Sequence, residues 1–136
     1  MKNILEEIAA RTRERIAKEK TCISVSELEN RIQEVNKNAR QKITFLQALQ
    51  KDGMSYICEV KKASPSKGLI APDFPYLAIA KEYEQADASA ISCLTEPFYF
   101  QGADRYLREI AAAVQIPVLR KDFTVDEYMI YQAKSL

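Results

Sequence analysis

A glutamate and a lysine stand two positions apart in the segment EVKKASPSKG, residues 59–68, directly after a short apolar run. Side chains on a strand alternate between its two faces, so Glu59 and Lys61 share one face. Lys121 ends another apolar run, PVLRK. A partly enclosed lysine donates a proton or holds a carboxylate, and a nearby glutamate balances its charge or acts as a base. These residue types indicate proton transfer on an anionic substrate.

The same residues also have a purely structural interpretation, because charged side chains at strand ends are commonly solvated. The loop Ser64-Pro65-Ser66 offers hydroxyl groups on a rigid turn that would position a substrate. The aromatic run that ends in Phe100 serves either as a substrate wall or as packing for a helix. Periodicity alone leaves these alternatives open.

Composition excludes several kinds of chemistry. The chain has 136 residues, 47% of them apolar, a net charge of +1 and no histidine. Without histidine, Ser-His and Cys-His nucleophilic sites are excluded, and the commonest neutral metal ligand is missing. The balanced charge argues against a nucleic-acid partner, and no apolar run is long enough for a membrane span. We expect a cytoplasmic protein whose three cysteines are reduced thiols.

Alternating strand and helix patterns begin at residue 54. Strands are expected at 55–61, 89–94 and 117–121, and helices at 75–86, 103–114 and from 125 onward. This order is typical of βαβ units with a parallel sheet, and the strands recur at the spacing of about 30 residues that such units need. Either a doubly wound sheet or a segment of a (β/α)8 barrel fits. The chain has neither a G-x-G-x-x-G motif nor a Walker loop.

The N-terminal residues 1–53 have a different pattern, and we expect them to form a helical extension before the first strand. Overlapping capping boxes at Ser24 and Ser26 predict a helix that runs to about Asn38. Thr44 opens a short third helix, and Gly53 is expected as its left-handed stop. Residues 54–136 would then form three βα units.

In a barrel, Cys58 and Val60 would pack under the helices. Glu59, Lys61 and Lys121 would then point into the barrel at the carboxyl ends of their strands, where barrel active sites are built. The barrel interpretation therefore gives the three charged residues a common location.

Three motifs together resemble the indole-3-glycerol phosphate synthase family: EVKKASPSKG, TEPFYFQG and PVLRKDF, each after an expected strand. Their order and spacing are similar to those of the family, as is the helical extension of about fifty residues, and the resemblance covers essentially the whole chain. It implies an α/β fold, the (β/α)8 TIM barrel, and a tryptophan-pathway enzyme. The implied reaction closes the ring of 1-(2-carboxyphenylamino)-1-deoxyribulose 5-phosphate with loss of CO2 and water. It implies no metal and no organic cofactor.

The resemblance also implies residue roles. Lys121 resembles the general acid that protonates the substrate's carbonyl oxygen. Lys61 resembles the lysine that holds the anthranilate carboxylate and assists dehydration, and Glu59 resembles its acidic partner near the substrate's amine. The residues that match substrate-binding positions are Ser64, Pro65, Ser66 and Phe100.

A complete barrel of this kind needs about 250 residues. We therefore expect the N-terminal portion of a barrel, three of eight βα units, that lacks the phosphate site and is inactive alone. A half-barrel has open strand edges, which favour self-association around Val118. The alternatives are a non-catalytic half-barrel that binds itself or a complementary fragment, and a barrel enzyme with a Schiff-base lysine.

Overall fold

A computed structural model describes residues 3–38 and 42–136, and these form two compact units. The first unit combines the N-terminal part of the chain with Phe123–Leu136, and the second covers the described part of Gln41–Asp122. The first contains α1 (Ile4–Cys22), α2 (Val25–Asn38) and α6 (Tyr128–Ser135). The second contains α3 (Phe45–Leu49), β1 (Ile57–Val60), β2 (Ala63–Ser64), β3 (Gly68–Leu69), α4 (Tyr76–Gln85), β4 (Ala90–Leu94), α5 (Asp104–Ala113) and β5 (Val118–Lys121).

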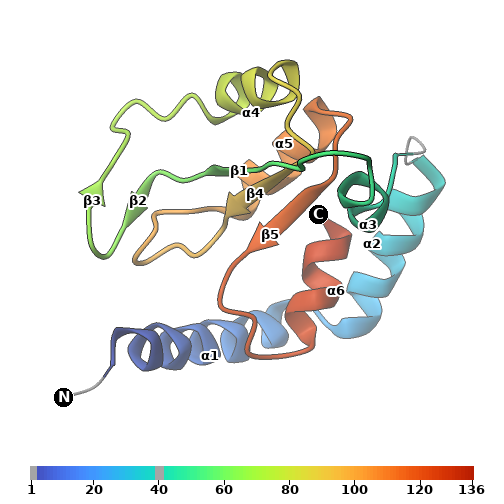
Figure 1. Ribbon diagram of the computed structural model, residues 1–136. Helices are drawn as coiled ribbons and strands as arrows, with labels where there is room; N and C mark the ends of the chain where they lie inside the picture. Colours follow the sequence, from blue (N-terminus) through green and yellow to red (C-terminus); the bar gives the residue numbers. More distant parts are fainter. Residues whose placement is uncertain (1–2, 39–41) are drawn as a thin grey trace. The chain divides into compact units, whose positions relative to one another are not determined.

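The first unit is a small helical assembly in which α6 packs against α2 (Figure 1). Its buried core consists of Ile16, Leu28, Tyr128 and Met129. The Tyr128 hydroxyl donates to the carbonyl oxygen of Ile23 at 2.9 Å, which satisfies the polar end of a buried ring. The end of the described chain is thereby joined to its first two helices.

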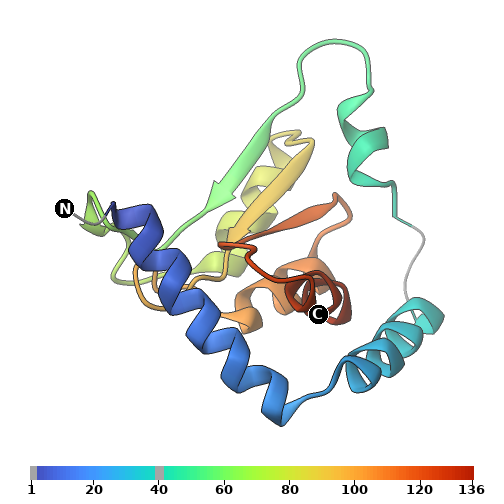
Figure 2. The ribbon, with the colours of Figure 1, turned by 90° about the horizontal axis from the view of Figure 1, so that it is seen from below.

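The second unit is built on a parallel three-stranded sheet in the order β1-β4-β5 (Figure 2). Ser92 on the central strand is in register with Glu59 on one side and with Leu119 on the other. Leu94, two positions further on, is in register with Lys121. Because parallel strands in register align their alternating side chains, these residues all lie on one face of the sheet.

Helices α4 and α5 cover the opposite face of the sheet. The side chains on that face include Val60, Ile91 and Cys93, which are all buried. On the face that carries Glu59, the apolar side chains of the outer strands remain open: Ile57 is 48% exposed and Leu119 is 45% exposed. One face of the sheet is therefore a helix-covered core, and the other is accessible at its two outer strands.

The structure confirms the expected strands and helices of the sheet region, with ends that are either as expected or shortened by one to three residues. The expected second helix is α2, and the Ser24 hydroxyl accepts a hydrogen bond from the Glu27 amide at 3.1 Å. The α/β class is also as predicted. The boundary between a helical extension and barrel units at residues 53 and 54 stays a prediction.

Three details differ from expectation. Helix α3 ends at Leu49, where the Gln50 amide closes the last turn, so Gly53, with its positive φ of 85°, is not its stop. Helix α6 begins three residues later than expected, because the Asp126 carboxylate accepts the Tyr128 amide and forms a turn before the helix. The loop after β1 contains an unexpected antiparallel hairpin of β2 and β3.

No helix within residues 3–38 or 42–136 combines the length and the hydropathy that a bilayer crossing requires.

Candidate active site

Glu59 lies at the centre of a cluster of three charged side chains. Its carboxylate oxygen Oε1 is 2.7 Å from Lys61 Nζ, and Oε2 is 2.9 Å from Lys121 Nζ. Glu59 lies in β1, Lys61 directly follows it, and Lys121 is the last residue of β5. The predicted common face of these three residues is confirmed, and one carboxylate joins both ammonium groups.

The two lysines determine the charge state of the glutamate. Partial burial raises the pKa of Glu59, but hydrogen bonds and charge attraction from Lys61 and Lys121 outweigh it and hold the pKa below its usual value. The carboxylate is therefore ionised at neutral pH. The cluster carries two positive charges and one negative charge, a balance that suits an anionic ligand.

A side chain of α4 anchors the backbone of Glu59. The Tyr83 hydroxyl of α4 donates to the Glu59 carbonyl oxygen at 3.2 Å, which links β1 to the helix that covers its other face. The cluster lies at the carboxyl ends of the strands, and a (β/α)8 barrel has its active site at this end.

The loop Ser64-Pro65-Ser66 forms the turn of the β2–β3 hairpin. The Ser64 hydroxyl accepts the Lys67 amide at 3.2 Å, and Ser64 is in register with Gly68. Ser64 is buried, whereas Pro65 and Ser66 are exposed at the tip. The Ser64 hydroxyl therefore stabilises the turn that contains it. The sequence predicted a rigid turn, and the structure shows that this turn belongs to a β-hairpin.

Phe100 belongs to a loop that is organised around Glu96. The Glu96 carboxylate, only 1% exposed, accepts the amides of Phe98, Tyr99 and Phe100 at 3.0, 2.7 and 3.0 Å. The Gly102 amide donates to the Glu96 carbonyl oxygen at 2.8 Å. This loop follows β4, the strand between those of Glu59 and Lys121, so Phe100 is held at the same end of the sheet.

Sequence reasoning missed the residues that support the cluster, namely Thr95, Glu96, Arg120 and Asp122. The sequence did contain a signal for two of them, Arg120 and Asp122. Alternation places Arg120 and Asp122 on the helix-covered side of β5, where a charged side chain needs a partner. Within residues 3–38 and 42–136, no group of three or more His, Cys, Asp or Glu side chains is arranged to hold a metal ion.

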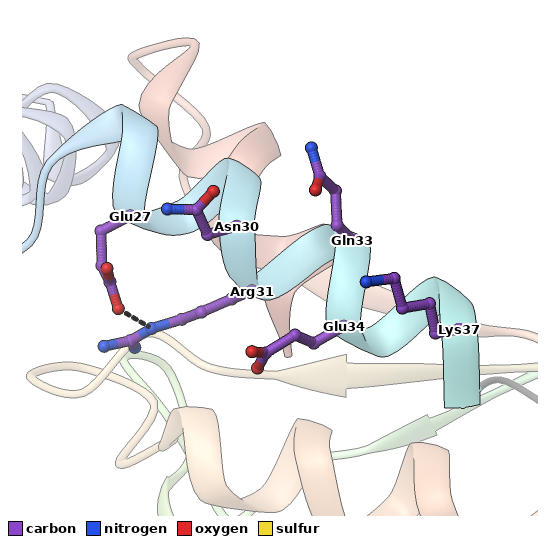
Figure 3. Close-up of a pocket in the computed structure, with 6 residues that line it drawn as sticks. All are labelled: Glu27, Asn30, Arg31, Gln33, Glu34 and Lys37. Carbon is purple, nitrogen blue, oxygen red and sulfur yellow. Dashed lines mark hydrogen bonds and ion pairs between the residues drawn. The ribbon is translucent and has the colours of Figure 1, made fainter.

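A separate hollow lies along α2, and Figure 3 shows its polar lining. The lining residues are Glu27, Asn30, Arg31, Gln33, Glu34 and Lys37. The Arg31 guanidinium is 3.1 Å from the Glu27 carboxylate, an ordinary pair one helical turn apart. None of the candidate catalytic residues lines this hollow, and its side chains have the mixed charge of a solvated helix face.

Successive βα units and a parallel sheet with helices on one face define an α/β protein, and a charged cluster at the carboxyl ends of the strands is consistent with part of a (β/α)8 barrel. Comparison with known proteins identifies the family within this class. Residues 5–136 match the family model for indole-3-glycerol phosphate synthase. The chain therefore belongs to the indole-3-glycerol phosphate synthase family.

Individual relatives agree with this assignment. Indole-3-glycerol phosphate synthase of Lacticaseibacillus paracasei is 52% identical over 132 residues, which cover 97% of this chain and 50% of the relative. The protein of that name from Ruminiclostridium cellulolyticum is 50% identical over 131 residues, 96% of this chain and 49% of the relative. The protein of that name from Thermoanaerobacter pseudethanolicus is 45% identical over 133 residues, which cover 98% of this chain and 49% of the relative. The chain spans about half the length of the curated relatives it matches.

Proposed function

We propose that this chain supplies catalytic groups for the indole-3-glycerol phosphate synthase reaction. A phosphorylated small molecule, 1-(2-carboxyphenylamino)-1-deoxyribulose 5-phosphate, loses CO2 and water as its ring closes to indole-3-glycerol phosphate. The observation that supports this best is the Glu59 carboxylate held between Lys61 and Lys121 at the carboxyl ends of parallel strands. The membership of the chain in the family gives the reaction class, a decarboxylating carbon–carbon lyase.

The charges of the cluster suit the three tasks that the reaction requires. Lys121 is the proposed general acid. It protonates the substrate's carbonyl oxygen while a carbon of the aromatic ring attacks the carbonyl carbon. Lys61 holds the substrate's carboxylate before CO2 leaves, and then assists loss of the hydroxyl group as water. Glu59, ionised between them, is the acidic partner near the substrate's amine and takes up the proton released there.

The remaining candidate residues would bind rather than react. The hairpin turn with Ser64, Pro65 and Ser66 would lie over the substrate, and Phe100 would form a wall beside its aromatic ring. The amides fixed by Glu96 support this role, because an aromatic wall is useful only if its loop has one conformation. A cytoplasmic location and the lack of nucleic-acid or membrane partners stay predictions.

Turnover of the carboxyphenylamino-deoxyribulose phosphate tests the proposal. The 136-residue chain would be assayed alone and mixed with the half of the Lacticaseibacillus paracasei relative that this chain does not match. We expect no turnover from the chain alone, and indole-3-glycerol phosphate formation from the mixture. Lys121→Ala in the mixture is expected to lower turnover by about 100-fold or more, the usual contribution of a positioned acid.

Lys81→Ala is the matched control, because it removes an exposed lysine of α4, a helix that covers the other face of the sheet. It should leave turnover in the mixture close to that of the unmodified chain. Equal turnover by the mixtures with Lys121→Ala and with the unmodified chain would remove Lys121 from its proposed role.

A second candidate function is association without catalysis, through the accessible face and outer strands of the sheet. Ile57 and Leu119 expose nearly half of their apolar surface there, and β5 pairs with β4 along only one of its edges within the described chain. We propose a second copy of this chain as the partner, paired along the strand that contains Val118. Light scattering should find dimers or larger species that Leu119→Ser shifts toward the monomer. A monodisperse monomer of the unmodified chain would exclude this alternative.

A further inference from the structure

Thr95, the first residue after β4, contacts three consecutive residues at the end of β5. Its amide donates to the Lys121 carbonyl oxygen at 3.0 Å. Its hydroxyl donates to Asp122 Oδ2 at 2.8 Å and accepts a hydrogen bond from Arg120 Nε at 3.0 Å. The side chain is 1% exposed, so water does not compete for these bonds. One threonine thus binds the backbone of Lys121 and both of its neighbours.

The two neighbours are themselves anchored. The Arg120 guanidinium is 3.0 Å from Asp104 Oδ1, at the first residue of α5, and 3.6 Å from Asp122 Oδ2. The side chains of Arg120 and Asp122 are 6% and 0% exposed. Charged groups at this depth resist displacement, because separating one from its partners leaves a charge without compensation. The Thr95 hydroxyl is therefore joined to an ionic network that connects β5 to α5 and is buried at Arg120 and Asp122, although the Asp104 side chain is 36% exposed.

Strand geometry connects this network to the lysine. Arg120 and Asp122 point to the helix-covered face, so the Lys121 side chain leaves the strand on the opposite face. Its own side chain is 53% exposed, and packing alone leaves a long, flexible lysine free to move. Its base is fixed by the backbone that Thr95 holds, and its tip by the 2.9 Å contact with Glu59.

We propose that Thr95 is a positioning residue for Lys121: its hydroxyl, clamped between Arg120 and Asp122, sets the direction in which the Lys121 ammonium reaches Glu59. The catalytic importance of where the Lys121 ammonium lies rests on the proposed function of Lys121. The location of the ammonium beside Glu59 is a property of the chain without substrate, and it can be measured in that state.

Thr95→Val is the decisive variant, because valine keeps the shape of threonine and the backbone amide but lacks the hydroxyl. The pKa of the Glu59 carboxyl would be measured by carbon-13 NMR titration of the unmodified chain, Thr95→Val, Thr95→Ser and Lys121→Met. We expect Thr95→Val to raise this pKa in the same direction as Lys121→Met, by a smaller amount. Thr95→Ser, which restores a hydroxyl, should return it toward the original value.

Thr12→Val is the matched control, since Thr12 is also 1% exposed and its hydroxyl donates to the Ile8 carbonyl oxygen at 2.9 Å. This variant loses a buried hydroxyl elsewhere and should leave the Glu59 pKa unchanged. If circular dichroism shows that Thr95→Val does not fold, Arg120→Lys takes its place, because it removes the Arg120 Nε hydrogen bond to the Thr95 hydroxyl. The Glu59 pKa is then measured in that variant with the same expected result. A Glu59 pKa equal to that of the unmodified chain would overturn the proposal. No substrate is used, so this result is independent of the turnover assay.

Discussion

Glu59 and Lys121 form a 2.9 Å ion pair although their strands, β1 and β5, lie on opposite sides of β4. Two strand spacings separate these backbones by about 9.6 Å, a distance that two long side chains can bridge only when both leave the same face. The small side chain of Ser92 occupies the position between their strands, in register with Glu59. The pair therefore crosses the central strand and joins two βα units.

Glu59 should stabilise the fold in a pH-dependent way. Its pKa in the folded chain lies below the ordinary value near 4.5, so its ion pairs stabilise the fold above that value and lose their effect as the pH falls through the folded-state pKa. Glu59→Gln should lower the free energy of unfolding at pH 7 by no more than about 1 kcal/mol, because both lysines are partly exposed to water.

Urea unfolding at pH 7 and at pH 3 measures this difference. We expect the difference in unfolding free energy between Glu59→Gln and the unmodified chain to narrow at pH 3, because the stability that a lowered carboxyl pKa contributes decreases as the pH falls below the ordinary value. An equal gap at both pH values would mean that the glutamine disturbs packing instead of charge.

Gly102 should tolerate no side chain. A Cβ there would lie 2.5 Å from the Leu94 carbonyl oxygen and 2.7 Å from the Thr95 Cα, and both are backbone atoms that cannot move aside cheaply. Gly102→Ala should cost at least about 2 kcal/mol of unfolding free energy and disturb the loop with Phe100. Calorimetry gives the stability, and the amide NMR shifts of residues 98–100 report the loop.

Gly53→Ala provides a comparison for that substitution. Gly53 has nothing within 4 Å of its would-be Cβ, but its φ is +85°. Its cost should come from backbone conformation alone, about 1 kcal/mol. A larger loss in Gly53→Ala than in Gly102→Ala would contradict the contact argument.

Replacing Asp87 by glycine should stabilise the fold. It follows helix α4 with a φ of 63°, the Ala88 amide donates to the Tyr83 carbonyl oxygen, and the Asp87 amide donates to that of Glu84. These bonds form a Schellman motif, whose left-handed position favours glycine. Asp87→Gly should raise the free energy of unfolding by about 0.5–1 kcal/mol, and Asp87→Ala should not. Thermal unfolding of both variants checks this, and equal melting temperatures would argue against the motif as the cause.

Two of the cysteines should differ sharply in reactivity. Burial, with a smaller effect from the Asp104 carboxylate, raises the pKa of the Cys93 thiol to about 12, whereas Cys22 is exposed. Because the thiolate is the reactive form, iodoacetamide at pH 8 should label Cys22 in the folded chain and Cys93 only after unfolding. Peptide mass spectrometry identifies the labelled residue. Labelling of both at equal rates without denaturant would show that the β4 region opens readily.

Much of the fold could be predicted from local patterns. Alternation along β1 and β5 placed Glu59, Lys61 and Lys121 on one face, and the structure confirms this common face, with both lysines in contact with Glu59. The hairpin of β2 and β3 could not be predicted in this way, because strands of two residues are too short to show a period. The end of α3 was misplaced for a related reason: a five-residue helix shows little periodicity, and its last turn closed before the glycine.

The amino-acid sequence by itself determined which residue types can perform the chemistry and which face of each strand carries them, because strand periodicity is a local property of the chain. Only the tertiary structure decided that β4 lies between β1 and β5, which joins Glu59 to a lysine 62 positions away. It also decided that the Thr95 hydroxyl binds Arg120 and Asp122. Such contacts depend on strand order and burial, which arise from the packing of distant segments and leave no period in the sequence.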